Sequence, residues 1–163
     1  MLGRVELEQL KSDLTMHWAI VGIMLAMLVA YVIVCIIFGD QIQTPLPEAQ
    51  RVLIRTILYV ITIVTFPMTN LIRHIQVRLN QTMPYSHGTP GIEAKNRYLV
   101  TVIVSMSLIE AVGFFGFVMF ILGDNFNTLY IFSGLSALGM FLYRPKIDEY
   151  VRIVEALTAQ KNE

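Results

Sequence analysis

The sequence predicts an all-α, polytopic membrane protein with four transmembrane helices, both termini inside and a short amphipathic C-terminal helix. Composition is the first reason, because the 163 residues are 55% hydrophobic and 15% charged, whereas soluble domains carry about 25% charged residues. The second reason is that the apolar residues fall in four blocks, each comparable to the about 20 helical residues that cross a bilayer core. The third is the uneven distribution of lysine and arginine among the connections.

The four apolar blocks are expected to form the transmembrane helices of one membrane domain, residues 1–163. In lipid the backbone must satisfy its polar groups within the segment, so long apolar runs form helices rather than isolated strands. The blocks also lack the alternation that marks the ~10-residue strands of a membrane β-barrel. The expected spans are about 17–38, 52–75, 98–122 and 127–143.

The first block could also be a cleaved signal peptide, but three features argue against that interpretation. Its apolar run is longer than that of a typical signal peptide, the segment before it carries both signs of charge, and no small-residue cleavage site follows. We therefore expect a retained helix, with Ser12 or Asp13 as its N-terminal cap.

Lysine and arginine predict the orientation of the spans. Ten of the 12 basic residues fall in the N-terminal segment, the second connection and the C-terminal segment, whereas the first and third connections carry mainly acids. The positive-inside rule then places both termini and the second connection in the cytoplasm, with the chain in the plasma (inner) membrane. The residues that carry this prediction are Arg4, Lys11, Arg73, Arg78, Lys95, Arg97, Arg144, Lys146, Arg152 and Lys161.

Arg51 and Arg55 are the two exceptions, and they lie one helical turn apart at the start of the second block. One interpretation is that both side chains snorkel to the outer headgroups. The other is that they contact an anion or a carboxylate at that surface. The sequence leaves both interpretations open.

Two segments outside the spans are expected to lie in the cytoplasm. The connection 76–97 contains prolines and glycines that break a helix, and the helices on both sides are expected to extend into it. The tail 144–163 has apolar residues at helical spacing, which predicts a short amphipathic helix on the membrane or against another cytoplasmic element. These apolar residues are Ile147, Val151, Ile153, Val154 and Leu157.

Glu110 is the one charged residue between Tyr98 and Gly123, near the middle of the third block. No lysine or arginine is expected at its depth, so we expect a protonated carboxyl that both donates and accepts hydrogen bonds. It could be a link between helices, worth about 1 kcal/mol, or a proton or cation site, as intramembrane ionisable residues often are. A third interpretation, which overlaps both, is a contact to another subunit or to a lipid-soluble ligand such as a quinone. The candidate hydrogen-bond partners at similar depth are Ser107, Thr62, Thr65, Ser133 and Ser136.

Small residues predict where helices pack closely. The first block carries small residues at a spacing of four, which brings two helix backbones near each other. The third and fourth blocks also have small residues near mid-depth. The expected helix-packing residues are Gly22, Ala26, Ala30, Gly113, Gly116, Gly134 and Ala137.

The third block has a recognisable order of residues around its carboxylate, which follows two basic residues of the polar connection. The matching positions are Lys95, Arg97, Ser105, Glu110, Ala111, Phe115 and Gly116. In this order, residues 91–122 resemble the carboxylate-bearing second helix of subunit c in rotary ATP synthases. The resemblance implies that Glu110 corresponds to the ion-carrying carboxylate. The preceding block differs from that family because it lacks glycine and contains Pro67, and no hairpin is duplicated.

Other functional classes find little support in the sequence. Zero net charge leaves no basic footprint for nucleic acid, and the single Cys35 cannot form an internal disulfide or a multi-cysteine metal site. No metal-ligand cluster, nucleophile beside a histidine or phosphate-binding glycine loop is found, so we expect no enzymatic activity, metal or cofactor. His17 and His74 could ligate a haem near an interface, but ordinary interfacial placement explains them better.

Two functional hypotheses follow. The first is a small integral membrane protein that acts without chemistry of its own, as a non-catalytic subunit of a membrane complex or as a homo-oligomeric bundle. Its partners would be the lipid bilayer and other membrane subunits or copies of itself. The alternative is a protein that binds or translocates protons or cations through Glu110, distantly like subunit c.

Overall fold

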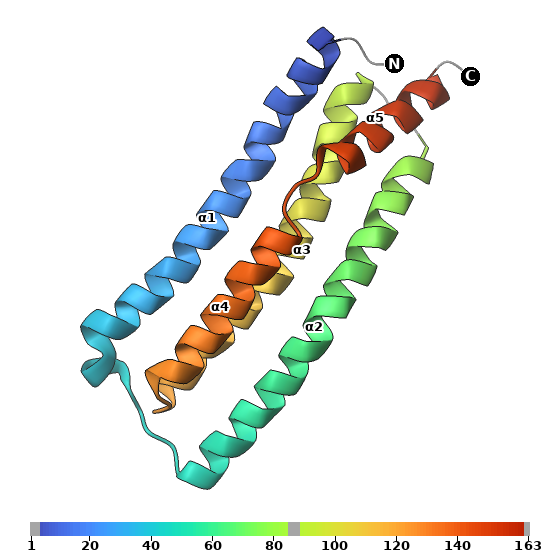
Figure 1. The fold of residues 1–163 in the computed structure, drawn as a ribbon. Coiled ribbons are helices and arrows are strands. Elements are labelled where there is room, and N and C mark those ends of the chain that lie inside the picture. Colours follow the sequence, from blue (N-terminus) through green and yellow to red (C-terminus); the bar gives the residue numbers. More distant parts are fainter. Residues whose placement is uncertain (1–3, 85–88, 162–163) are drawn as a thin grey trace.

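A computed structural model describes residues 4–84 and 89–161, with side chains from residue 12 onward. Four long helices run side by side, and a fifth lies at one end of the bundle (Figure 1). All regular structure in the described ranges is helical, which confirms the all-α prediction. The helices are α1 (Arg4–Ile42), α2 (Glu48–Thr82), α3 (Pro90–Ile121), α4 (Phe126–Leu142) and α5 (Ile147–Lys161).

α3 is the central helix, because it packs against each of the other four. Half of its most apolar stretch is buried, compared with 11% for α1 and for α2. The largest core cluster joins α3 residues such as Tyr98, Met106 and Ile109 to apolar residues of α1, α4 and α5. The outer surfaces of α1 and α2 are left rich in exposed apolar side chains, which is stable where lipid rather than water surrounds them.

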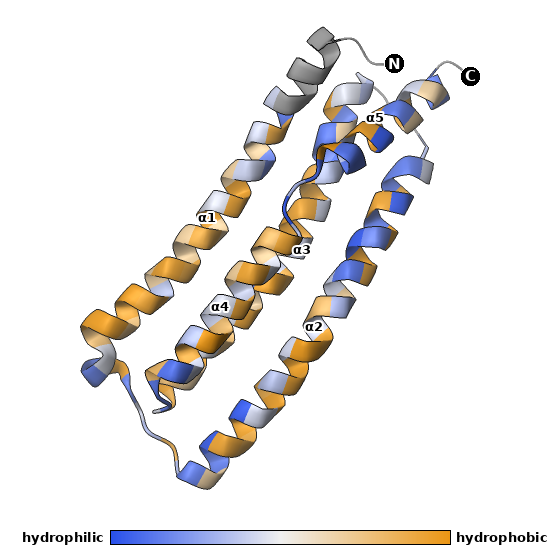
Figure 2. Ribbon diagram, in the orientation of Figure 1, coloured by the Kyte–Doolittle hydropathy of each residue, from blue (hydrophilic) through white to orange (hydrophobic). Residues whose placement is uncertain are grey.

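α1, α2 and α3 are each long and apolar enough to cross a membrane. Figure 2 shows apolar residues concentrated in the middle of the bundle and hydrophilic residues gathered at its ends. α4 has 17 residues, and it counts as a further candidate span only together with α5, from which it is bent by 44°. The structure therefore has three candidate spans, or four if the bent pair is one span.

Several helices are longer than the expected spans. α1 already begins at Arg4, so Ser12 and Asp13 lie inside it and the expected cap at these residues is wrong. The reason is that the polar segment before the apolar block is itself rich in good helix formers, which carry the helix on. α2 continues to Thr82 and α3 begins at Pro90, so both helices extend into the segment 76–97, as expected.

α5 packs against the bundle rather than lying apart from it. Its residues Tyr150, Ile153 and Leu157 are fully buried, and they join the core cluster with Leu14 of α1 and Tyr98 of α3. Of the two positions expected for the amphipathic tail, the structure thus selects contact with other helices. We call this end of the molecule the α5 end; it also holds the start of α1, the end of α2 and the start of α3 (Figure 1).

At the opposite end, the α1–α2 connection is joined to the turn between α3 and α4. The backbone N–H of Thr44 donates to the carbonyl of Ile121 at 2.7 Å, and that of Leu46 donates to Leu122 at 3.1 Å. Gly123 in this turn has φ of +87°, and a Cβ there would stand 2.7 Å from the Cα of Pro45. The turn needs glycine for both reasons, because side chains disfavour this backbone conformation and the neighbouring backbone leaves no space.

Candidate functional site

Glu110 lies on α3 with 8% of its surface exposed. The hydroxyl of Tyr31, on α1, donates a hydrogen bond to its Oε1 at 3.3 Å. The Tyr31 ring stacks on Phe117 with centroids 5.4 Å apart and meets Phe114 edge-on at 5.8 Å. Among the described residues no basic side chain forms an ion pair with Glu110, so the carboxyl lies between two helices in an aromatic setting.

The side chain bonded to Glu110 was not among the candidates from the sequence, and the structure places those candidates elsewhere. Ser136 donates to the carbonyl of Ile109 at 2.9 Å, and Thr65 donates to the carbonyl of Ile61 in its own helix. Ser107 is exposed. The hydroxyls of Thr62 and Ser133 are buried and have no hydrogen-bond partner in the described part of the protein. The structure therefore brings Glu110 and its hydrogen-bond donor together across α1 and α3.

The expected packing residues divide into two groups. Gly113 and Gly116 lie inside the bundle, where an added Cβ would come within 3.2 Å of Ser136 and 2.9 Å of Phe132. Gly134 has nothing within 4 Å of such a Cβ, and Ala137 is half-buried. A Cβ added at Gly22 would also meet nothing within 4 Å. Together with two alanines of α1, Gly22 forms an exposed stripe of small residues, which consists of Gly22, Ala26 and Ala30.

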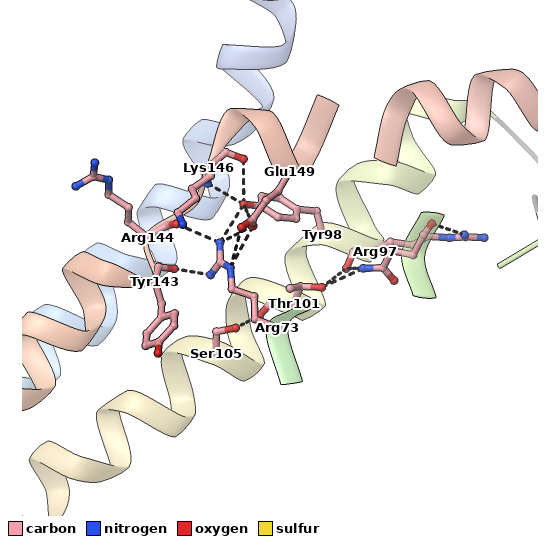
Figure 3. Close-up of polar contacts among 10 residues, drawn as sticks. Arg73, Arg97, Tyr98, Thr101, Ser105, Tyr143, Arg144, Lys146 and Glu149 are labelled. Carbon is pink, nitrogen blue, oxygen red and sulfur yellow. Dashed lines mark hydrogen bonds and ion pairs between the residues drawn. The ribbon is translucent and has the colours of Figure 1, made fainter. Parts of the chain in front are cut away.

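A buried arginine organises the α5 end. Arg73 of α2 is 4% exposed, and its Nη2 lies 2.8 Å from Oε2 of Glu149 on α5. The same guanidinium donates to the backbone carbonyls of Tyr143 and Arg144 in the α4–α5 connection. Figure 3 shows the guanidinium reaching from α2 into this connection. An arginine side chain presents five donors in a fixed fork. Arg73 can therefore join α2 to the bend between α4 and α5 through several hydrogen bonds at once.

Tyr98 of α3 completes this arrangement. Its hydroxyl accepts hydrogen bonds from the backbone N–H of Lys146 at 2.8 Å and from Arg73 Nη2 at 3.2 Å. The same hydroxyl oxygen lies 3.1 Å from the carbonyl oxygen of Lys146 and 3.1 Å from Oε2 of Glu149, and the hydroxyl donates to one of these two acceptors (Figure 3). We call Arg73, Tyr98 and Glu149 the Arg73 cluster; it joins α2, α3 and α5.

A second polar group lies beside the Arg73 cluster and ties α1 to the same end. Asp13 pairs with Lys95 Nζ at 3.3 Å and accepts from the Tyr150 hydroxyl at 3.3 Å. Burial raises the pKa of Tyr150, and the nearby Asp13 carboxylate is the second cause of this increase. The Tyr150 hydroxyl therefore keeps its proton and remains a hydrogen-bond donor. His17 is fully buried between the rings of Tyr98 and Tyr150.

Neither of the histidines considered as haem ligands is set up as one in this arrangement. The two ring nitrogens of His17 face the backbone carbonyls of Asp13 and Lys95 at 3.2 and 3.3 Å. His74 is exposed on α2. In the described ranges no three His, Cys, Asp or Glu side chains are grouped so that they could hold a metal ion.

A cavity of about 570 Å³ opens between the end of α2 and the α4–α5 connection. Most of its charged lining is basic, and its single carboxylate among the described lining residues is the one already paired with Arg73. Its floor is therefore part of the Arg73 cluster. We call it the basic groove, defined by Arg73, His74, Arg78, Lys146, Glu149 and Arg152.

The two arginines at the opposite end make protein contacts. Arg55 Nη1 lies 3.2 Å from the carboxylate of Asp124, which is 4% exposed. Arg51 donates to the carbonyl of Gly123 at 2.9 Å. Of the two interpretations from the sequence, contact with a carboxylate is the one that Arg55 makes. Both arginine side chains fasten α2 to the α3–α4 turn.

Two of the residues that organise these sites were missed by the sequence analysis. Arg73 continues a helical face of α2 that also buries Thr69 and Val77, and this spacing of four residues was the available signal. Tyr31 had no comparable signal, because a tyrosine within an apolar block can equally face lipid. Its relation to Glu110 depends on how α1 is rotated against α3.

Comparisons of this chain with models of protein families, with curated proteins and with solved structures find no match.

Proposed function

We propose that this protein is a small multi-pass membrane protein that serves as a non-catalytic helical subunit. It assembles through α1 with a transmembrane helix of another subunit or of a second copy. The observation that carries the proposal is the exposed small-residue stripe of Gly22, Ala26 and Ala30 on α1.

The stripe has no function within the bundle. A Cβ at Gly22 would meet nothing within 4 Å, and Ala26 and Ala30 are exposed on the same helix. Neighbouring outward positions carry large apolar residues, such as Ile23, which is 60% exposed. Lipid contact does not require small residues, whereas close approach of two helix backbones does, so the stripe fits a second helix better than it fits lipid.

Bulky substitution of the stripe tests this assembly. We expect Gly22→Val to reduce the assembled fraction, seen by native mass spectrometry after extraction in mild detergent, because the added methyl groups separate the backbones. The fold of each chain should be kept, since the new side chain meets no group of its own protomer. The matched control is Gly134→Val on α4, another exposed glycine with nothing within 4 Å. Equal loss in both variants, or a lone monomer for the unaltered protein, would contradict the proposal.

The orientation that fits this function places the protein in the plasma (inner) membrane with the α5 end and both termini on the cytoplasmic side. The positive-inside rule supports this orientation, because the α5 end contains Arg73, Arg78, Lys146 and Arg152. In this arrangement α4 crosses the membrane as the fourth span and α5 rests on the cytoplasmic end of the bundle.

A second candidate function is proton or cation binding at Glu110. Its supporting observation is a carboxyl that is 8% exposed and hydrogen-bonded by Tyr31, with no ion-pair partner among the described residues. The resemblance of residues 91–122 to the subunit c helix points to the same role. Loss of ion coupling in an assembled Glu110→Gln variant is the result that this function requires.

A further inference from the structure

The basic groove holds more positive charge than its own carboxylate neutralises. Arg73 and Glu149 pair with each other at 2.8 Å in the floor. The side chains of Arg78, Lys146 and Arg152 line the groove and are exposed, and none of them forms an ion pair with any described residue. Three cations around one cavity, without an ion-pair partner in the described part of the chain, create a local positive potential, which concentrates anions there.

The groove is also held in shape by the backbone around it. Arg73 donates to the carbonyls of Tyr143 and Arg144, so α2 is fastened to the connection that carries Lys146. On α2, His74 and Arg78 lie one turn apart and therefore face the same side. The cations consequently converge on a preformed cavity of about 570 Å³ rather than being scattered over a surface.

The groove lies where the apolar part of the bundle ends. Leu142, the last residue of α4, lines the groove and is 50% exposed. On α2, Leu71 and Ile75 are 55% and 47% exposed within the turns that flank the groove. A soluble anion would use only the cations, whereas a phospholipid would place its phosphate among the cations and its acyl chains against these apolar side chains.

We propose that the basic groove binds the phosphate of an anionic phospholipid from the leaflet at the α5 end. Basic pockets between helices at the membrane surface recognise such headgroups through charge and hydrogen bonds. The proposal requires that the bundle spans a membrane, but it does not require assembly through the α1 stripe, because every lining group comes from one chain. Failure of one proposal therefore leaves the other standing.

The test measures lipid binding to the full-length protein in neutral detergent. Native mass spectrometry counts bound lipid while phosphatidylglycerol or phosphatidylcholine with the same acyl chains is titrated. We expect a saturable phosphatidylglycerol site, with affinity at least about tenfold above that for phosphatidylcholine, because each basic residue near the headgroup adds about fivefold. A third titration with inorganic phosphate separates a lipid from a free anion.

Matched charge variants locate the site. Arg152→Gln removes a groove cation of α5, and Lys161→Gln removes an exposed cation of the same helix that does not line the groove. We expect Arg152→Gln to weaken phosphatidylglycerol binding about fivefold, and Arg78→Gln with Arg152→Gln to weaken it by about 25-fold. Lys161→Gln should leave it nearly unchanged. Thermal unfolding should be similar for all, because these side chains are exposed and form no ion pair with any described residue.

Three results would overturn the inference. Equal binding of the two lipids would show that the headgroup charge is not recognised. Equal weakening by Arg152→Gln and Lys161→Gln would show general attraction by the basic end rather than a site. Saturable binding of inorganic phosphate without preference between the lipids would assign the groove to a soluble anion.

Discussion

At the scale of single residues, the buried polar groups divide by the partners available to them. Arg73 is surrounded by a carboxylate, a hydroxyl and two backbone carbonyls, so its charge is compensated although it is 4% exposed. Glu110 has one neutral donor, Tyr31. A buried charge without a counter-charge is costly; Arg73 has a counter-charge in Glu149, whereas Glu110 has none among the described residues.

Substitutions of Glu110 separate an ion-binding role from a structural one. Glu110→Gln keeps the size of the side chain and its ability to accept from Tyr31, so the bundle should remain assembled while any ion coupling is lost. Glu110→Leu removes the hydrogen bond and should lower the stability of the bundle by about 1 kcal/mol. Ion flux into reconstituted vesicles and thermal unfolding in detergent measure the two effects.

Carbodiimide labelling offers an independent measurement, because the reagent modifies protonated carboxyls in apolar surroundings. We expect labelling of Glu110 at neutral pH and none of Glu155, which is exposed on α5. Unlabelled Glu110 would count against the ion-binding role, as would full coupling in Glu110→Gln.

At the scale of helices, close packing depends on which glycines face a neighbour. α3 and α4 approach closely where Gly116 lies against Leu129 and Phe132. The end of α2 is tied to α3 by Arg97, which donates to the carbonyls of Asn80, Met83 and Pro84. These carbonyls would otherwise lack partners at the helix end, so a single side chain of α3 both caps α2 and fixes its position.

Two glycine-to-alanine substitutions test this packing. In Gly116→Ala the new Cβ would stand 2.9 Å from Phe132 Cβ and 3.1 Å from the Leu129 carbonyl oxygen, so α3 and α4 must separate. We expect a loss of about 1–3 kcal/mol in stability, seen as a lower thermal midpoint in detergent. Gly134→Ala should leave the midpoint unchanged or raise it, because its Cβ meets nothing within 4 Å and alanine favours the helix. Similar midpoints for both variants would mean that α3 and α4 do not pack as described.

At the scale of the whole molecule, polar contacts fasten the bundle at its two ends and apolar packing fills the middle. The Arg73 cluster and the Asp13–Lys95 pair join four helices at the α5 end. The Arg55–Asp124 pair and the turn at Gly123 fasten the other end. Such an arrangement suits a membrane protein, because in a bilayer the polar groups at both ends would lie at headgroup depth while the middle would contact lipid.

The orientation of the molecule in the membrane can be measured with cysteines in place of two exposed alanines. Ala49 is the second residue of α2 at one end, and Ala159 lies near the end of α5 at the other. In a Cys35→Ala background, an impermeant maleimide added to intact cells should label Ala49→Cys and not Ala159→Cys, because the positive-inside rule places the α5 end inside. Both should react in lysed membranes. Labelling of Ala159→Cys on intact cells would reverse the proposed orientation.

The sequence by itself determined the helical fold. The length of the apolar blocks and the charges between them can be read directly from the chain, and they predict helices without knowledge of any contact between distant residues. It also identified Glu110 as a buried carboxylate and α5 as amphipathic. Only the tertiary structure decided which partner each polar group has. Tyr31 rather than a serine or threonine bonds Glu110, and Arg73 is buried against Glu149 from a helix 76 residues away in sequence. These contacts depend on the rotation and tilt of helices against one another, which no periodicity along a single chain segment encodes.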